Sequence, residues 1–185
     1  MRIIQMLSTI AYGDAVSNDT IAMEKIIKEM GYDTKIYAES IVPPLDKKTA
    51  VSVDKLTDVH QDDIIIFHMS TGSKLNYDVA KYNCRKIVVY HNITPPEYFR
   101  NCDERFTKIC EYGLEGAKYL ADKVDYCLAV SEFNKQNLID MGYKCDIDVL
   151  PIIIPMSDYD KKPDKDVIKA VSYTHLRAHE TRSNL

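Results

Sequence analysis

Hydrophobic positions follow two alternating patterns along the first 150 residues. Continuous apolar runs, rich in β-branched residues and without polar alternation, are typical of strands in parallel sheets covered on both faces. They lie at residues 2–8, 34–38, 62–68, 86–91, 126–131 and 147–151. Between them, apolar residues spaced three or four apart predict helices near residues 17–30, 77–82, 103–123 and 132–141. Strands that alternate with helices predict an α/β fold with a doubly wound parallel sheet.

Local signals indicate where these helices begin and end. The side chain of Ser17, Asn18 or Asp19 can accept a bond from a free backbone N–H and so cap the first helix. Gly31 follows the helix where a left-handed residue is favoured. The long helix at 103–123 has one apolar stripe, formed by Phe106, Ile109, Cys110, Leu114, Ala117 and Leu120.

Composition places the chain among ordinary globular proteins. It has 185 residues, of which 45% are hydrophobic and 28% charged, with a net charge of −4, so nothing in the charge favours nucleic acid. No apolar run approaches the roughly 20 residues that cross a membrane, and the start lacks a signal peptide. We therefore expect a cytoplasmic protein. Membrane-surface association has no support, because no basic amphipathic helix is visible.

The cysteines do not form a metal or disulfide pattern. They are dispersed and odd in number, and no pair has C-x-x-C spacing: Cys84, Cys102, Cys110, Cys127 and Cys145. We expect free thiols.

Polar residues gather where the predicted strands end, and ligands of open parallel sheets bind at those carboxyl ends. The candidates are Gly13, Asp14, His68, Ser70, Thr71, His91, Asn92, Ser131 and Glu132. A single strand-end histidine is more often a packed core or rim residue than a catalytic one. Two, His68 and His91, beside hydroxyl and amide side chains favour a polar sugar-binding cleft.

Cofactor motifs are missing. Gly13 stands alone, so the dinucleotide fingerprint G-x-G-x-x-G fails, and Gly72-Ser73-Lys74 lacks the first glycine of a P-loop. We expect no cofactor and no metal. A lone glycine before a capped helix lets an anionic diphosphate approach the helix N-terminus. An ordinary turn without a ligand explains the same glycine equally well.

Four segments together resemble the N-terminal domain of family 4 glycosyltransferases: Gly13–Asp19, Val89–Pro96, Leu128–Phe133 and Leu150–Pro151. The resemblance runs from residue 2 to about 165. Many relatives carry two glycines in the first turn, where this chain has Gly13-Asp14.

The resemblance implies a GT-B architecture of two Rossmann-like domains that face a cleft. The N-terminal domain would take a hydroxyl acceptor, and the C-terminal domain would hold a nucleotide-diphosphate sugar. The enzyme would transfer the sugar with retention and without a metal. By resemblance, His91 would face the donor sugar, and Gly13 and Asp14 would lie near the donor phosphates or the acceptor. The acceptor pocket would be bordered by His68, Ser70 and Thr71, with Asn92 beside it, and Ser131 and Glu132 would line the cleft.

The end of the chain predicts a division into three parts. Residues 1–156 would be the acceptor-side domain, and the charged residues 157–170 a linker toward a donor-binding domain. Residues 171–185 would be a non-native tail, because Val171–Thr181 resembles a translated transposase sequencing adaptor. We expect the natural protein to be longer and the 185-residue chain alone to be inactive.

Three other interpretations compete. The first is a stand-alone, non-catalytic Rossmann-like module that binds a sugar or nucleotide. The second is a sugar-nucleotide epimerase or dehydrogenase, which the missing fingerprint disfavours. The third is a GT-B enzyme of another family with an acidic donor sugar.

Overall fold

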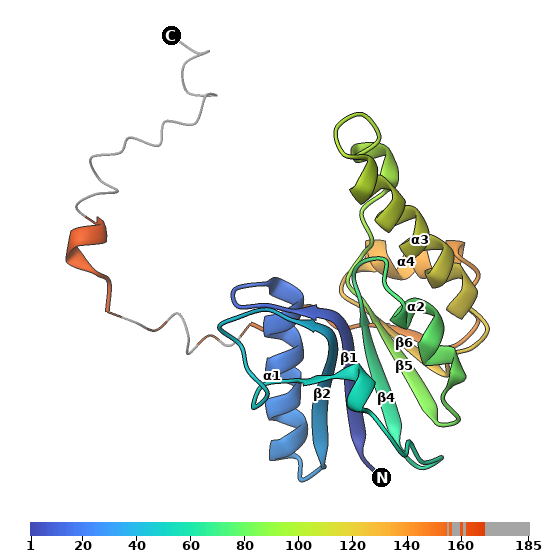
Figure 1. Cartoon of the computed structure of the whole chain (residues 1–185), viewed down its shortest axis with the longest axis horizontal. Helices are drawn as coiled ribbons and strands as arrows, with labels where there is room; N and C mark the ends of the chain where they lie inside the picture. The colour runs from blue at the N-terminus through green and yellow to red at the C-terminus, as the bar shows by residue number, and fades with distance from the viewer. Residues whose placement is uncertain (155, 157–159, 161, 169–185) are drawn as a thin grey trace. The chain divides into compact units, whose positions relative to one another are not determined.

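The computed structural model describes residues 1–154, 156, 160 and 162–168, and residues 1–154 form one compact unit. Its strands form a single parallel sheet in the order β3-β2-β1-β4-β5-β6-β7 (Figure 1). The strands are β1 (Ile3–Ile10), β2 (Thr34–Ile41), β3 (Val51–Ser52), β4 (Ile64–Met69), β5 (Arg85–Tyr90), β6 (Tyr126–Ala129) and β7 (Ile147–Val149). The helices are α1 (Ala15–Glu29), α2 (Leu75–Asp78), α3 (Glu104–Leu120) and α4 (Glu132–Asp140), with short 3₁₀ turns at Val53–Lys55, Val79–Lys81 and Pro96–Tyr98. The predicted α/β fold, a Rossmann-like doubly wound parallel sheet, is confirmed.

Every predicted strand is present, but the sheet has one more. β3 is only two residues long and pairs with Tyr37 and Ala38 of β2. So short a segment carries no hydrophobic period, so the pattern could not reveal it. β4 also ends one residue later than predicted, so His68 is the second-last residue of the strand and not the last.

The first helix begins earlier than the sequence predicted, and the expected caps at Ser17, Asn18 and Asp19 are wrong. Asp14 is the N-cap, and its carboxylate accepts the backbone N–H of Ser17 at 2.8 Å and the Ser17 hydroxyl at 2.7 Å. Asp19 lies a full turn inside the helix and is buried. Gly31 follows the helix at a φ of 86°, as predicted.

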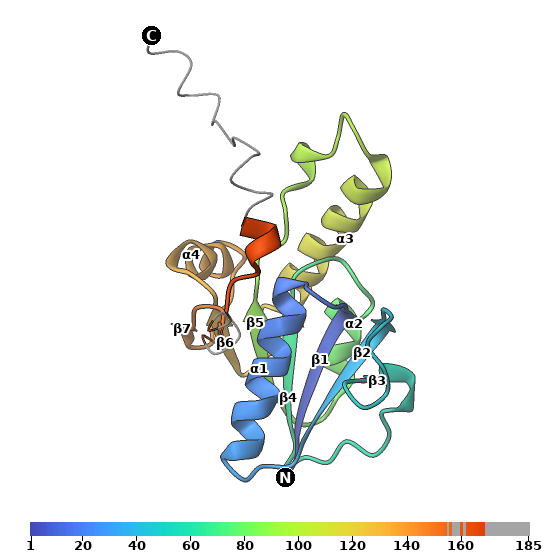
Figure 2. The ribbon, with the colours of Figure 1, turned by 90° about the vertical axis from the view of Figure 1, so that its left-hand side faces the viewer.

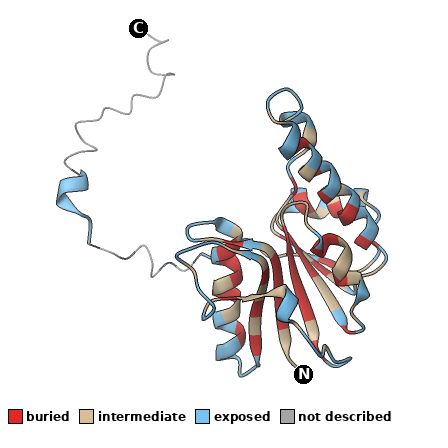
Figure 3. Cartoon of the chain, viewed as in Figure 1, coloured by how far each residue is buried: buried red, intermediate tan, exposed pale blue. Residues whose placement is uncertain are grey.

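Helices cover both faces of the sheet (Figure 2). On one face, Met23 and Ile27 of α1 pack on Ile66 and Val89. On the other, α2, α3 and α4 pack on the strands through residues that include Leu75, Cys110, Ala117, Leu120 and Leu138. The buried positions therefore run along the central strands and the inner sides of the helices (Figure 3).

The predicted stripe of α3 is only partly buried. Phe106 is half exposed, although its ring stacks on Phe99 at a centroid distance of 5.5 Å. The close helix contact is instead made by small residues. A Cβ atom added to Gly72, in the loop after β4, would lie 2.0 Å from the Ile109 carbonyl oxygen and 2.9 Å from the Gly113 nitrogen. Because both glycines lack a side chain, the loop that carries Ser70 and Thr71 rests directly on the backbone of α3.

Two further predictions concerned the cysteines and membrane-spanning segments. The cysteines are free thiols, as predicted, although the Cys127 and Cys145 sulfur atoms lie 3.6 Å apart. No helix among the described residues is both long and apolar enough to cross a membrane. The predicted adaptor tail at 171–185 lies outside the described residues, as do residues 157–159, 161, 169 and 170 of the predicted linker.

Candidate functional site

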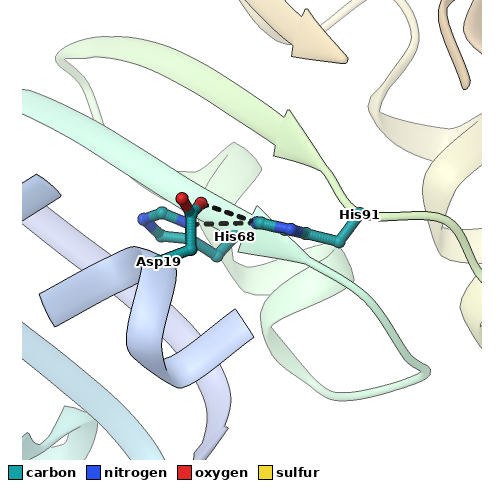
Figure 4. Close-up of side chains that lie close together, drawn as sticks. All are labelled: Asp19, His68 and His91. Carbon is teal, nitrogen blue, oxygen red and sulfur yellow. Dashed lines mark hydrogen bonds and ion pairs between the residues drawn. The ribbon is translucent and has the colours of Figure 1, made fainter. Parts of the chain in front are cut away.

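Side chains from three neighbouring strands and one helix meet near the carboxyl ends of β4 and β5. Gln5 comes from β1, His68 from β4, and His91 directly follows β5. The backbone N–H of His91 still donates to the Met69 carbonyl at 2.9 Å, so the ladder fixes its position. Asp19 of α1 lies above the same face (Figure 4). We call these four residues the histidine cluster.

The cluster is a connected polar network. His68 Nδ1 lies 3.1 Å from His91 Nε2, and His68 Nε2 lies 3.0 Å from Gln5 Oε1. The two imidazole rings are stacked, with centroids 5.4 Å apart. The Asp19 Oδ2 atom lies 3.8 Å from His91 Nε2, and Asp19 Oδ1 accepts the backbone N–H of Ile153 at 2.6 Å. Segments far apart in the sequence are thus joined through one carboxylate.

Burial keeps both histidines neutral. The His91 side chain is 1% exposed and that of Asp19 3%, so what His91 shows to solvent is its main chain. Burial lowers the pKa of His91 to about 4, with the Asp14 carboxylate acting in the opposite direction. Burial and the neighbouring His91 hold the pKa of His68 well below its usual value. Burial also raises the pKa of the Asp19 carboxyl, which the bond from Ile153 partly opposes.

A pH titration should show this directly. We expect the imidazole proton signals of His91 to stay constant from pH 8 to about pH 5 and to move with a midpoint of about 4. The unfolded chain takes up the same proton near pH 6.5. Stability should therefore fall as the pH drops from about 6.5 toward 4, by about 1.4 kcal/mol per pH unit for this one group.

The control is the His91→Asn variant, which lacks the group. Its urea-unfolding free energy should fall less steeply with pH across the same window. An NMR midpoint near 6.5 for His91, or equal slopes for the two chains, would contradict the buried neutral state.

The β1–α1 turn contains the predicted residues Gly13 and Asp14. Both are exposed, and Gly13 has a φ of 76°, a left-handed conformation that suits glycine. Asp14 uses its carboxylate to cap α1. A negative charge already occupies the helix N-terminus, so this turn is a poorer phosphate site than the lone glycine alone indicated.

The other predicted residues lie around the cluster and do not join it. Ser70 and Thr71 are half-buried in the loop after β4, and Ser131 caps α4 by accepting the Asn134 backbone N–H at 3.2 Å. Glu132 is exposed in the first turn of that helix. Asn92 follows His91 at a φ of 76°, so the chain turns sharply just after the histidine.

A cavity of about 420 Å³ opens beside the strand end that carries His91. Of the predicted binding residues, Asn92 lines this cavity. All of the lining residues belong to the compact unit 1–154, and among them Asp140 is the one that is charged. Its lining consists of Tyr90, Asn92, Ile93, Pro95, Tyr98, Leu114, Phe133, Asn137, Asp140 and Met141. Aromatic rings with amide side chains suit a neutral ligand that has both apolar and hydrogen-bonding faces.

The histidine cluster also has atoms that could hold a metal ion. Asp19, His68 and His91 each offer one ligand atom, and these atoms lie within 4.8 Å of one another. The three residues are far apart in the sequence, so a search for metal-ligand spacing could not bring them together. The same three side chains take part in the polar network described above.

Sequence reasoning found the two histidines and missed their partners. Gln5 is a polar residue inside the first apolar run, and a buried amide in a strand needs a partner. The polar Gln5 within an apolar run was therefore a signal that could have identified it from the sequence. Asp19 gave no such signal, because a carboxylate near the start of a helix is ordinarily a cap.

Comparison of the chain with models of known protein families and with curated proteins gives no match.

Proposed function

We propose that this chain is the N-terminal, acceptor-side half of a retaining GT-B glycosyltransferase of the family 4 type. The enzyme would move a sugar from a nucleotide-diphosphate sugar to an acceptor hydroxyl. The observation that carries the proposal is the neutral His91, held at the carboxyl end of β5 by His68 and Asp19. A Rossmann-like fold serves many functions, so the fold alone would not support this proposal.

A neutral, fixed imidazole suits the chemistry of sugar transfer. The barrier lies in charge that develops on an oxocarbenium-like sugar and on the departing diphosphate. Dipoles fixed in advance stabilise such charge without a reorganisation cost. His91 would contact the donor sugar through its solvent-facing main chain. Its ring lies beneath the surface, so a substrate group reaches the ring only when the residues that cover it move.

The surroundings of the cluster favour an acceptor site over a diphosphate site. The cavity walls carry one acidic residue and no lysine or arginine in this part of the molecule, and Asp14 places a carboxylate at the start of α1. Both features disfavour a phosphate. The basic groups that hold the donor would then come from the second domain.

The cavity supports an acceptor that carries a sugar ring. Tyr98 and Phe133 supply aromatic rings to its lining, and Asn92 and Asn137 supply amide groups, which can donate and accept hydrogen bonds. Stacking and hydrogen bonding together recognise a sugar, whose faces are apolar and whose edge carries hydroxyls.

A turnover assay tests the proposal. The completed reading frame would be expressed and supplied with nucleotide-diphosphate sugars and sugar acceptors, and release of the nucleoside diphosphate would be measured. We expect turnover with retained anomeric configuration, and no turnover by the 185-residue chain. Turnover by the 185-residue chain alone would contradict the two-domain proposal. Sugar binding without turnover by the completed protein would favour the non-catalytic binding module instead.

A further inference from the structure

We infer that Asp19 is a positioning residue, which fixes His91 as its Nε2-protonated tautomer and leaves Nδ1 as a hydrogen-bond acceptor. The inference concerns a proton position and stands on geometry. Its importance for catalysis rests on the proposed function of His91.

In the network, one proton lies between each pair of linked atoms. If Gln5 Oε1 accepts from His68 Nε2, then His68 Nδ1 is bare and must accept from His91 Nε2. His91 then carries its proton on Nε2. If the Gln5 amide is turned round, it donates to His68, every role reverses, and His91 carries its proton on Nδ1.

Asp19 decides between these two arrangements. Its Oδ2 atom lies 3.8 Å from His91 Nε2, in surroundings that exclude water. A carboxylate stabilises the partial positive charge of a nearby N–H and destabilises a bare nitrogen lone pair, and low dielectric strengthens both effects. The first arrangement places the N–H of His91 near the carboxylate, whereas the second places a lone pair there. The geometry therefore favours the first.

The other ring nitrogen does not distinguish the two arrangements. His91 Nδ1 is buried and has no hydrogen-bond partner among the described residues. It is therefore unpaired in both, as an acceptor in the first and as a donor in the second. In the first arrangement, movement of the residues that cover the ring would let Nδ1 accept a bond from a hydroxyl or N–H of a ligand.

The position of Asp19 is itself fixed by the segment that follows β7. The backbone N–H of Ile153 donates to Asp19 Oδ1 at 2.6 Å, which leaves Oδ2 on the side of His91. Under the proposed architecture this segment leads toward the second domain. Asp19 would then connect the path of the chain between the domains with the proton position of His91.

The test is ¹⁵N NMR of the imidazole nitrogens in the 185-residue chain, since protonated and bare ring nitrogens resonate in separate regions. In the wild-type chain we expect His91 to be protonated on Nε2 and bare on Nδ1. In Asp19→Asn, the amide oxygen should still accept from Ile153, so its NH₂ group would face His91. The ratio of Nε2- to Nδ1-protonated His91 should then fall on the order of tenfold. The control is Glu29→Gln, which removes an exposed charge from the same helix and should leave the ratio unchanged.

Three results would overturn the inference. The first is a wild-type His91 protonated on Nδ1, which needs no variant to be seen. The second is a folded Asp19→Asn chain with an unchanged tautomer ratio. The third is a purified chain with one tightly bound metal equivalent on the two histidines, because the ring nitrogens would then be ligands. Each of these readouts is independent of turnover, so failure of the inference is distinguishable from failure of the proposed function.

Discussion

Replacing His91 by alanine in the completed enzyme should lower kcat by about 10²–10³-fold, the usual cost of removing one fixed group that stabilises charge in a transition state. The reason is positional. His91 is held by the β4–β5 ladder through its backbone and by His68 and Asp19 through its ring. Alanine keeps the ladder and so leaves the main chain in place, but it removes the fixed imidazole dipole that would stabilise the developing charge. Initial rates at saturating donor and acceptor measure the effect.

The matched control for this prediction is His60→Ala. His60 lies exposed in the loop before β4, at the opposite end of that strand from His68. We expect its kcat to match that of the wild type. If the His91→Ala enzyme is folded and its kcat is within twofold of the wild-type value, the His91 side chain has no role in the reaction.

Replacing Gly72 by alanine should destabilise the chain by about 3 kcal/mol or more, at the upper end of the cost of overpacking. The new Cβ would lie 2.0 Å from the Ile109 carbonyl oxygen, and its neighbours are backbone atoms that cannot rotate away. Relief requires α3 to move off the loop. That movement would also break the bond from the Asn76 amide to the Gly113 carbonyl, now 3.3 Å long. The free energy of unfolding in urea measures the loss.

Gly142→Ala separates this steric effect from backbone strain. Gly142 has a φ of 94° and nothing within 4 Å of an added Cβ. Alanine at this position should lower the free energy of unfolding only by the strain of the left-handed conformation, about 1–2 kcal/mol. A Gly72→Ala chain as stable as Gly142→Ala would show that the loop and α3 are not in backbone contact.

The fold could be predicted because its signals are local and repeated. Each central strand is an apolar run buried on both faces, and each helix has its own period, so the pattern alone indicated a parallel sheet. The parts that were missed lack a local signal. β3 is two residues long, and the cap of α1 was misassigned because several residues in one turn have side chains that can cap.

The site could be predicted only in part, for the same reason. A rule about strand ends placed His68 and His91 together, since neighbouring parallel strands end at one edge. The rule could not predict that both rings would be buried, because that depends on how α1 covers the sheet. Nor could it find Asp19, whose role depends on a bond from Ile153, 134 positions along the chain. Such contacts exist only after folding.

Sequencing the source DNA through codon 170 and onward would show whether a second domain follows. We predict an open frame of about 180–220 further residues, the size of a second domain. It should read as a second set of alternating strands and helices, with a basic strand end followed by Glu-x7-Glu, as the glycosyltransferase resemblance implies. A stop codon within a few residues would contradict the account and leave a lone Rossmann-like binding domain.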